Sequence, residues 1–174
     1  TAGASRDEIM ALDASQRLLD AAAAAMDYLA AQGVTAVHHM GTWQDLELFR
    51  VAERRGLLKV RIYACTPLHE WQRLADEVRQ RGRGDEWLSI GGLKGYVDGS
   101  LGSHTAALLQ PFDDAPKDRG LLVNSAEDLE TWTAAADAAG LQVAVHAIGD
   151  RANRLQLDVF ERVAKQNGPR DRRF

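Results

Sequence analysis

Short apolar, β-branched runs alternate along the chain with longer segments in which apolar and polar residues recur at helical spacing. The apolar runs predict strands near residues 34–39, 57–64, 88–97 and 141–147. Helices are predicted at 15–31, 42–56, after Pro67, at 125–140 and at 151–166. Strands that alternate with helices in this way are typical of a parallel sheet with helical crossovers.

Residues with strong positional preferences set the predicted helix starts. Thr42, with Asp45 three residues later, matches a capping box. Ser125 and Asp150 are predicted to cap the helices that follow them, since both residue types are preferred at that position. Pro67 fits the first position of the third helix, where its missing N–H costs nothing.

Two architectures fit this alternation: an open doubly wound sheet, or an arc of a (β/α) barrel. In both, chemistry lies at the carboxyl ends of the strands. The longest connection, residues 98–120, follows the third strand at such an end. Loops of this length are more often binding loops or lids than simple connections.

Two strand ends carry candidate chemistry. Lys94, Tyr96 and Asp98 share one face if side chains alternate along the third strand. Charged groups in an apolar strand are costly unless they are paired or bound to a metal, so a structural Lys94–Asp98 pair is the alternative. His146 ends the fourth strand, where it is either a metal ligand or a histidine of the core.

Other reactive residue types have plainer interpretations. His104 lies in the long loop, where a solvated side chain is the simpler expectation. His38 and His39 end the first strand and face opposite ways, so at most one points into a site. Cys65 is expected to be a small core residue.

Composition narrows the classes of function. The 174 residues are 45% hydrophobic with a net charge of −4, which fits a folded domain without a basic stripe for nucleic acid. No apolar run approaches the length of a membrane span. One cysteine excludes an intrachain disulfide and, with no visible signal peptide, favours the cytoplasm.

Four segments together resemble the YtcJ-like amidohydrolases, the amidohydrolase 3 family. The most specific is 92–109, in which Lys94 is followed by Asp-Gly and then by Gly-Ser and Thr-Ala. The second is 145–152, Val-His-Ala-Ile-Gly-Asp-Arg-Ala, and the others are 33–38 and 111–114. They occur in the family's order and cover nearly the whole chain.

The resemblance implies part of a (β/α)8 TIM barrel, with the four strands as about barrel strands two to five. Residues 1–174 would be a single, incomplete catalytic domain. The family holds one or two divalent metal ions, usually zinc. By motif, Lys94 matches its strand-four lysine, which related enzymes can carboxylate, and His146 matches its strand-five histidine. Both are therefore candidate catalytic residues and metal ligands. The candidate substrate-binding residues are Tyr96, Asp98, Ser100 and His104.

The chain also departs from the family. Residues 1–31 contain no His-x-His, and the strand-six histidine and strand-eight aspartate have no counterpart. His39 and His104 stand where aspartate and arginine are common. We therefore expect an internal fragment that is inactive and holds no ordered metal. Its open sheet edges would be covered by a longer chain or, in a homo-oligomer, by a second copy.

The expected activity of the complete protein is hydrolysis of a carbon–nitrogen bond in a small amide or cyclic amide, of the EC 3.5 type, by a metal-activated water. Two alternatives stay open. Lys94 could instead form a Schiff base in a barrel lyase, which leaves His146 without a role. A non-catalytic binding or assembly module is the other, and it would apply if the chain is complete.

Overall fold

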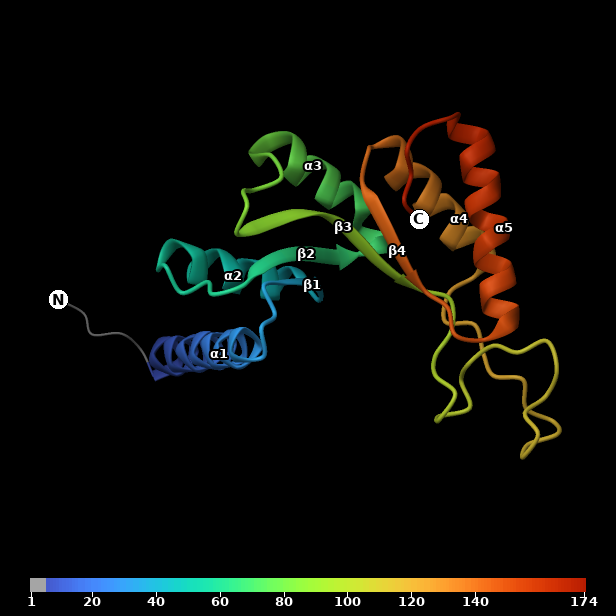
Figure 1. Ribbon diagram of the computed structural model, residues 1–174, viewed down its shortest axis with the longest axis horizontal. Helices are drawn as coiled ribbons and strands as arrows, with labels where there is room; N and C mark the ends of the chain where they lie inside the picture. The colour runs from blue at the N-terminus through green and yellow to red at the C-terminus, as the bar shows by residue number, and fades with distance from the viewer. Residues whose placement is uncertain (1–5) are drawn as a thin grey trace. The chain divides into compact units, whose positions relative to one another are not determined.

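The computed structural model describes the backbone of residues 6–174 and the side chains of residues 15–174. Every predicted strand and helix is present (Figure 1). In chain order the elements are α1 (Arg6–Ala31), β1 (Ala36–Met40), α2 (Trp43–Arg54), β2 (Arg61–Pro67), the 3-10 turn η1 (Leu68–Glu70), α3 (Trp71–Arg81), β3 (Leu88–Tyr96), α4 (Ala126–Ala138), β4 (Gln142–His146) and α5 (Asp150–Asn167).

The strands form one sheet in the order β1-β2-β3-β4, and a helix joins each strand to the next. β3 and β4 run parallel, with Gly92 opposite Gln142 and Tyr96 opposite His146. An open doubly wound sheet would reverse its order midway, whereas a barrel adds each strand beside the last. The sequential order therefore confirms the predicted fold class, four parallel strands of a partial (β/α) barrel.

Two compact units make up the chain. The first contains residues 1–64 and 83–90, and its buried side chains include Leu46, Val60 and Ile62. The second contains residues 65–82 and 91–174 and carries all the candidate site residues. In the second unit, α4 packs against α5 through Ala134, Val159 and Val163.

Three helices end in the same way, and this corrects the predicted starts of three strands. After α1, α2 and α4 comes a glycine at positive φ, followed by an apolar residue whose N–H returns to the last turn of the helix. This is the Schellman arrangement, in which that apolar residue belongs to the helix end. The returning residues are Val34, Leu57 and Leu141, so the strands begin only at 36, 61 and 142.

Two other boundaries differ from the prediction. Helix α1 begins at Arg6 rather than 15, and residues 6–14 contain no glycine or proline to stop it. Pro67 is not the first residue of the third helix. It ends β2 with an extended ψ of 136° and precedes the η1 turn, and α3 begins only at Trp71. Proline also favours an extended conformation at Thr66, which lengthens the strand.

Both predicted helix caps at threonine and serine are confirmed. The Thr42 N–H donates to Asp45 Oδ2 at 2.7 Å, and the Asp45 N–H donates to Thr42 Oγ1 at 3.3 Å. Burial alone would raise the pKa of Asp45, but the hydrogen bonds from Thr42 hold it below its ordinary value. The Asp128 N–H donates to Ser125 Oγ at 3.0 Å at the start of α4.

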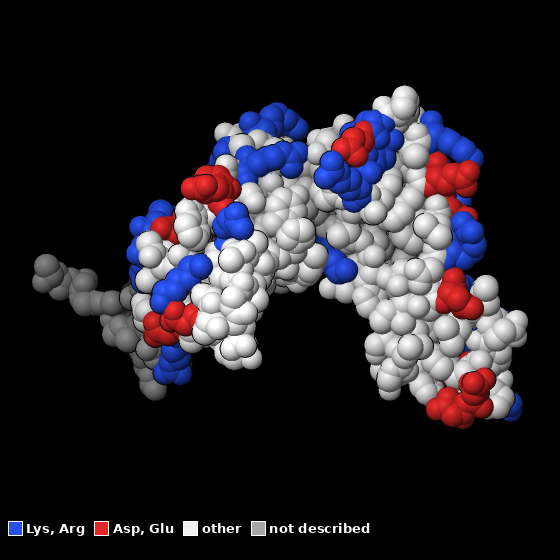
Figure 2. Space-filling model, in the orientation of Figure 1, with Lys and Arg blue, Asp and Glu red and all other residues white. Residues whose placement is uncertain are grey.

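Charged side chains of both signs lie on the surface. Figure 2 shows acidic and basic side chains interspersed on the face in view, without a large patch of either sign. Among the helices within the described range, none combines the length and apolar character needed to cross a membrane.

Candidate functional site

The register of β3 and β4 brings three candidate side chains to one face of the sheet. Lys94 is opposite Ala144, and Tyr96 is opposite His146, so Lys94, Tyr96 and His146 point the same way. Lys94 Nζ lies 4.9 Å from the centroid of the Tyr96 ring, and the Tyr96 and His146 rings are 5.5 Å apart. Lys94 and His146 thus share one face of adjacent strands.

Burial lowers the pKa of Lys94. The loss of solvent lowers the pKa of its ammonium group, and the nearby Cys65 opposes this change only in part. Burial raises the pKa of the Cys65 thiol to about 11, with the charge of Lys94 acting against it. Cys65 is thus a buried, protonated thiol, as expected of a core residue, beside an amine that loses its proton more readily than usual.

We predict that Lys94 titrates below the ordinary lysine value of about 10.4 in the metal-free protein, because burial penalises its charged form. Competitive acetylation at a series of pH values, read by mass spectrometry, would give its midpoint. The same peptide in denatured protein is the matched control and should titrate at the ordinary value. Equal midpoints in the two states would contradict the prediction.

A hydrogen bond fixes which nitrogen of His146 is free. Its Nε2 lies 2.6 Å from the carbonyl oxygen of Gly99. A carbonyl oxygen can only accept, so Nε2 carries the proton and Nδ1 of the neutral ring keeps its lone pair. Asp98 Oδ1 lies 3.8 Å from the same Nε2 and favours the same arrangement. The imidazole is therefore oriented by the start of the long loop.

Asp98 lies just beyond the end of β3, and its carboxylate is bound by backbone amides. The residue is 1% exposed. Its Oδ2 accepts from the N–H groups of Ala107 and Gly149, both at 2.8 Å, and its Oδ1 accepts from Ile148 at 3.0 Å. Within the described part of the chain, this bonding replaces the Lys94–Asp98 pair considered as an alternative.

Asp150 does not cap α5, contrary to the prediction from the sequence; its side chain binds the long loop instead. The residue that caps α5 is Gly149, which has no side chain of its own to bond the start of the helix. Asp150 is the first residue of the helix, and its Oδ1 accepts from the N–H of Leu109, in the long loop, at 2.7 Å. A carboxylate at this position also suits the positive end of the helix dipole.

The Ser100 hydroxyl is engaged inside the long loop. Ser100 Oγ lies 2.8 Å from Ser103 Oγ, which in turn lies 2.6 Å from Thr105 Oγ1. The Ser100 N–H donates to Thr105 Oγ1 at 2.9 Å. A side chain at Gly99 would meet Thr105 Oγ1 at 2.0 Å, so this turn requires glycine. A role for Ser100 in substrate binding stays a prediction.

His104 contacts residues of its own loop. Its ring stacks on Phe112 at 4.4 Å, and its two ring nitrogens lie 3.3 Å from Asp114 and 3.7 Å from Asp118. The backbone at His104 has a φ of 53°, a region that residues other than glycine rarely adopt. The expected substrate contact of His104 likewise stays a prediction.

Sequence reasoning missed the partners that hold these residues in place. Thr105, Ala107 and Gly149 were not singled out, because backbone donors and small side chains give no chemical signal in a sequence. The sequence contains one signal, the glycine Gly149 directly before a predicted helix. In the structure, an added Cβ at this position would meet the Ala107 carbonyl oxygen at 1.8 Å. A glycine in that setting indicates close approach of another segment.

The candidate ligands in these residues do not complete a metal site. The described residues contain no group of three histidine, cysteine, aspartate or glutamate side chains that could hold a metal ion. Catalytic zinc normally uses three protein ligands. Lys94 and His146 are two candidate metal-binding side chains on one face of the sheet. These residues can therefore contribute to a zinc site, but they do not form a complete one.

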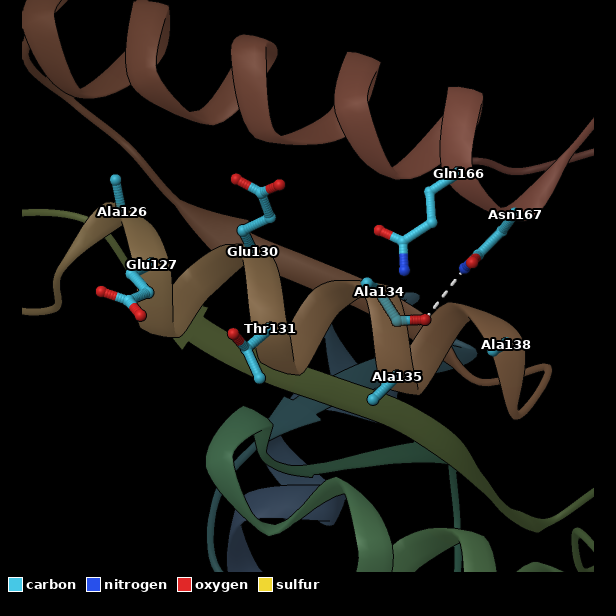
Figure 3. A pocket seen from close by; sticks show the side chains of 9 residues that line it. All are labelled: Ala126, Glu127, Glu130, Thr131, Ala134, Ala135, Ala138, Gln166 and Asn167. Carbon is cyan, nitrogen blue, oxygen red and sulfur yellow. Dashed lines mark hydrogen bonds between the residues drawn. The ribbon is translucent and has the colours of Figure 1, made fainter.

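The surface also has a groove of about 640 Å³ between α4 and α5 (Figure 3). Figure 3 shows Gln166 and Asn167 of α5 facing α4, where the Asn167 side chain donates to the Ala134 carbonyl oxygen at 2.9 Å. The groove shares no lining residue with the candidate site. The full lining is Ala126, Glu127, Glu130, Thr131, Ala134, Ala135, Ala138, Gln166 and Asn167.

Comparisons with known sequences point to one family. A family profile described as "Amidohydrolase family" matches residues 2–174. The Arabidopsis thaliana protein LONG AFTER FAR-RED 3 is 41% identical over 162 residues, which are 86% of this chain and 28% of that protein. The putative amidohydrolase YtcJ of Bacillus subtilis is 38% identical over 86 residues, which are 49% of this chain and 16% of that protein.

Two solved structures are similar to this chain. Both are described as uncharacterized metal-dependent hydrolases, and both are 35% identical in sequence. The protein from Pyrococcus horikoshii superposes with a TM-score of 0.78 over 86% of this chain and 31% of its own. The protein from Pyrococcus furiosus superposes with a TM-score of 0.72 over 81% of this chain and 30% of its own. The chain thus spans less than a third of the length of each of these relatives.

Proposed function

The chain belongs to the amidohydrolase family, and from that premise we propose that the complete protein is a metal-dependent hydrolase of carbon–nitrogen bonds in small amides or cyclic amides. One observation carries the proposal. Lys94 and His146 project from the same face at the carboxyl ends of neighbouring strands. Those ends are where barrel enzymes place their chemistry.

The two residues would act as metal ligands. His146 offers Nδ1, because its Nε2 donates to the Gly99 carbonyl. Lys94 offers an amine whose pKa burial has lowered, and a neutral or carboxylated lysine is a better ligand than an ammonium. A divalent metal, for which zinc is our choice, would supply Lewis-acid activation of a water molecule and of the scissile carbonyl.

The remaining contacts would orient the substrate. Tyr96 lies between Lys94 and His146 and leaves part of its ring exposed, so it can pack against a bound amide. Ser100 and His104 belong to the loop beside it.

We expect the 174 residues alone to be inactive, because they supply only two of the ligands that a catalytic metal needs. A cytoplasmic location and a homo-oligomeric state stay predictions.

One observation favours a second candidate. A lysine with a pKa lowered by burial is also what a Schiff-base lyase requires. Borohydride in the presence of a keto acid would trap the substrate on Lys94 if the lyase proposal is right. His146 separates the two, because the hydrolase needs its Nδ1 and the lyase does not.

Chelation provides the test of the proposed class. We expect the purified complete protein to hydrolyse members of an amide and cyclic-amide panel, to lose that activity on dialysis against a chelator, and to recover it with zinc. Such behaviour follows if the metal activates the water. Full activity after the metal has been removed, as verified by elemental analysis, would exclude the proposed mechanism.

A further inference from the structure

The carboxylate of Asp98 joins two segments that are distant in the sequence. Ala107 belongs to the long loop, whereas Ile148 and Gly149 form the turn between β4 and α5. All three donate backbone N–H bonds to this one buried side chain. Hydrogen bonds to an ionised acceptor are stronger than neutral ones, so the carboxylate is a firm link between the loop and the turn.

The contact between these segments extends beyond Asp98. An added Cβ at Gly149 would meet the Ala107 carbonyl oxygen at 1.8 Å, so the two backbones are in direct contact. The same carbonyl accepts from the Ala152 N–H at 3.3 Å. Two residues further along the loop, the Leu109 N–H donates to Asp150. The loop is therefore bonded along residues 107–109 to the start of α5.

His146 lies at the end of the strand that leads into this turn. Its Nε2 donates to the carbonyl of Gly99, the residue after Asp98, and lies 3.8 Å from Asp98 Oδ1. A shift of Asp98 would move both the carbonyl and the carboxylate that set the orientation of the imidazole. Groups that orient a ligating histidine in this way tune its binding from one shell further out.

We propose that Asp98 is a positioning residue: it fastens the 99–120 loop to the β4–α5 turn as a fixed wall of the site, and it holds His146 with Nδ1 free. The second part rests on the proposed function, and the first does not. Asp98 consequently does not contact substrate, which replaces the substrate-binding role expected from the sequence. The loop is a wall, not the lid that its length suggested.

Hydrogen exchange in the complete protein tests the link directly. Asp98→Asn keeps the shape but places an amide NH₂ group, which cannot accept, where one of the two acceptor oxygens stood. We expect exchange to rise roughly tenfold or more in peptides covering 105–110 and 147–150. Asp150→Asn, which affects the bonds from Leu109 and Arg151 but none from Ile148 or Gly149, is the matched control. It should change the 105–110 peptides less and leave Ile148 and Gly149 protected.

A second variant guards against a general folding defect. Gly149→Ala leaves Asp98 intact but pushes on the Ala107 carbonyl, and it should raise exchange in the same two segments. If Asp98→Asn does not raise exchange there above Asp150→Asn, the proposal is overturned, whatever Gly149→Ala does. If exchange rises throughout the protein and not in these segments first, the specific link is also wrong.

Metal affinity tests the positioning of His146. With zinc and a competing chelator, Asp98→Asn should bind zinc about 10–100-fold more weakly than the parent protein. Unchanged affinity would overturn the positioning of His146. If the parent protein binds no zinc, the proposed function fails, and the exchange experiment alone then decides whether Asp98 fastens the loop.

Discussion

Alanine at Lys94 or at His146 is expected to lower the metal-dependent turnover of the complete protein by more than about 100-fold. The expected size follows from the loss of about 10–100-fold when a partner one shell further out is removed. The ratio kcat/KM, measured on the substrate found in the amide panel, gives the result. His146→Ala also separates the proposed hydrolase from the lyase, which would keep its activity.

Matched replacements control for the loss of a lysine or a histidine as such. Lys165 is exposed on α5 and pairs with Glu161, so Lys165→Ala should leave turnover unchanged. His69 lies in the η1 turn, with its ring 6.0 Å from that of Trp132, and His69→Ala should do the same. Retained turnover in the Lys94 or His146 variant, with a native circular dichroism spectrum, would remove that residue from the proposed site.

The largest effect on stability is expected at Asp137, in the last turn of α4. Its carboxylate is buried and bonds to Arg170 at 2.6 Å, Asn167 at 2.7 Å and Arg172 at 2.9 Å. Asp137→Ala would leave the buried Arg172 without this partner. Breaking a buried pair in this way costs about 3–5 kcal/mol in the free energy of unfolding. Urea denaturation measures that loss.

An exposed aspartate in the same region provides the control. Asp171 pairs with Arg173, its one ion-pair partner among the described residues, and both side chains are exposed. Asp171→Ala should therefore change the free energy of unfolding by less than about 1 kcal/mol. Equal effects of the Asp137 and Asp171 variants would show that the buried cluster does not hold the chain end to α4.

The Asp137 cluster also predicts a dependence on pH. Burial alone would raise the pKa of Asp137, but the bonds from Arg172 and Asn167 and the charge of Arg170 hold it below its ordinary value. The folded state therefore binds this proton less readily than the unfolded state, so the stabilisation is complete above about pH 4 and is lost as the pH falls further. Asp137→Asn should flatten that loss of stability in acid.

Periodicity and caps were enough to predict the order of the elements. The capping box at Thr42 and the cap at Ser125 depend on neighbours three residues away, so a sequence contains all that they need. The strand starts were harder to predict. Val34, Leu57 and Leu141 are as apolar as strand residues, but each is bonded to the helix before it, and periodicity does not distinguish the two.

In the candidate site, the alternation of side chains predicts orientation only within a strand. Side-chain alternation placed Lys94 and Tyr96 correctly, because both lie within β3. Asp98 lies beyond Tyr96, the last residue of the strand, so alternation no longer applied to it. Its partners, Ala107 and Gly149, are contributed by backbone groups far along the chain. Bonds of that kind depend on the tertiary fold, and the residue types alone do not reveal them.

The central claim is that Lys94 and His146 hold the metal of a hydrolase. Anomalous diffraction from crystals of the complete protein, collected at the absorption edge of zinc, would locate that metal directly. We predict a peak about 2.0–2.1 Å from His146 Nδ1, with Lys94 also bound and Nε2 still donating to the Gly99 carbonyl. A metal bound by other residues, with neither Lys94 nor His146 within bonding distance, would contradict the account.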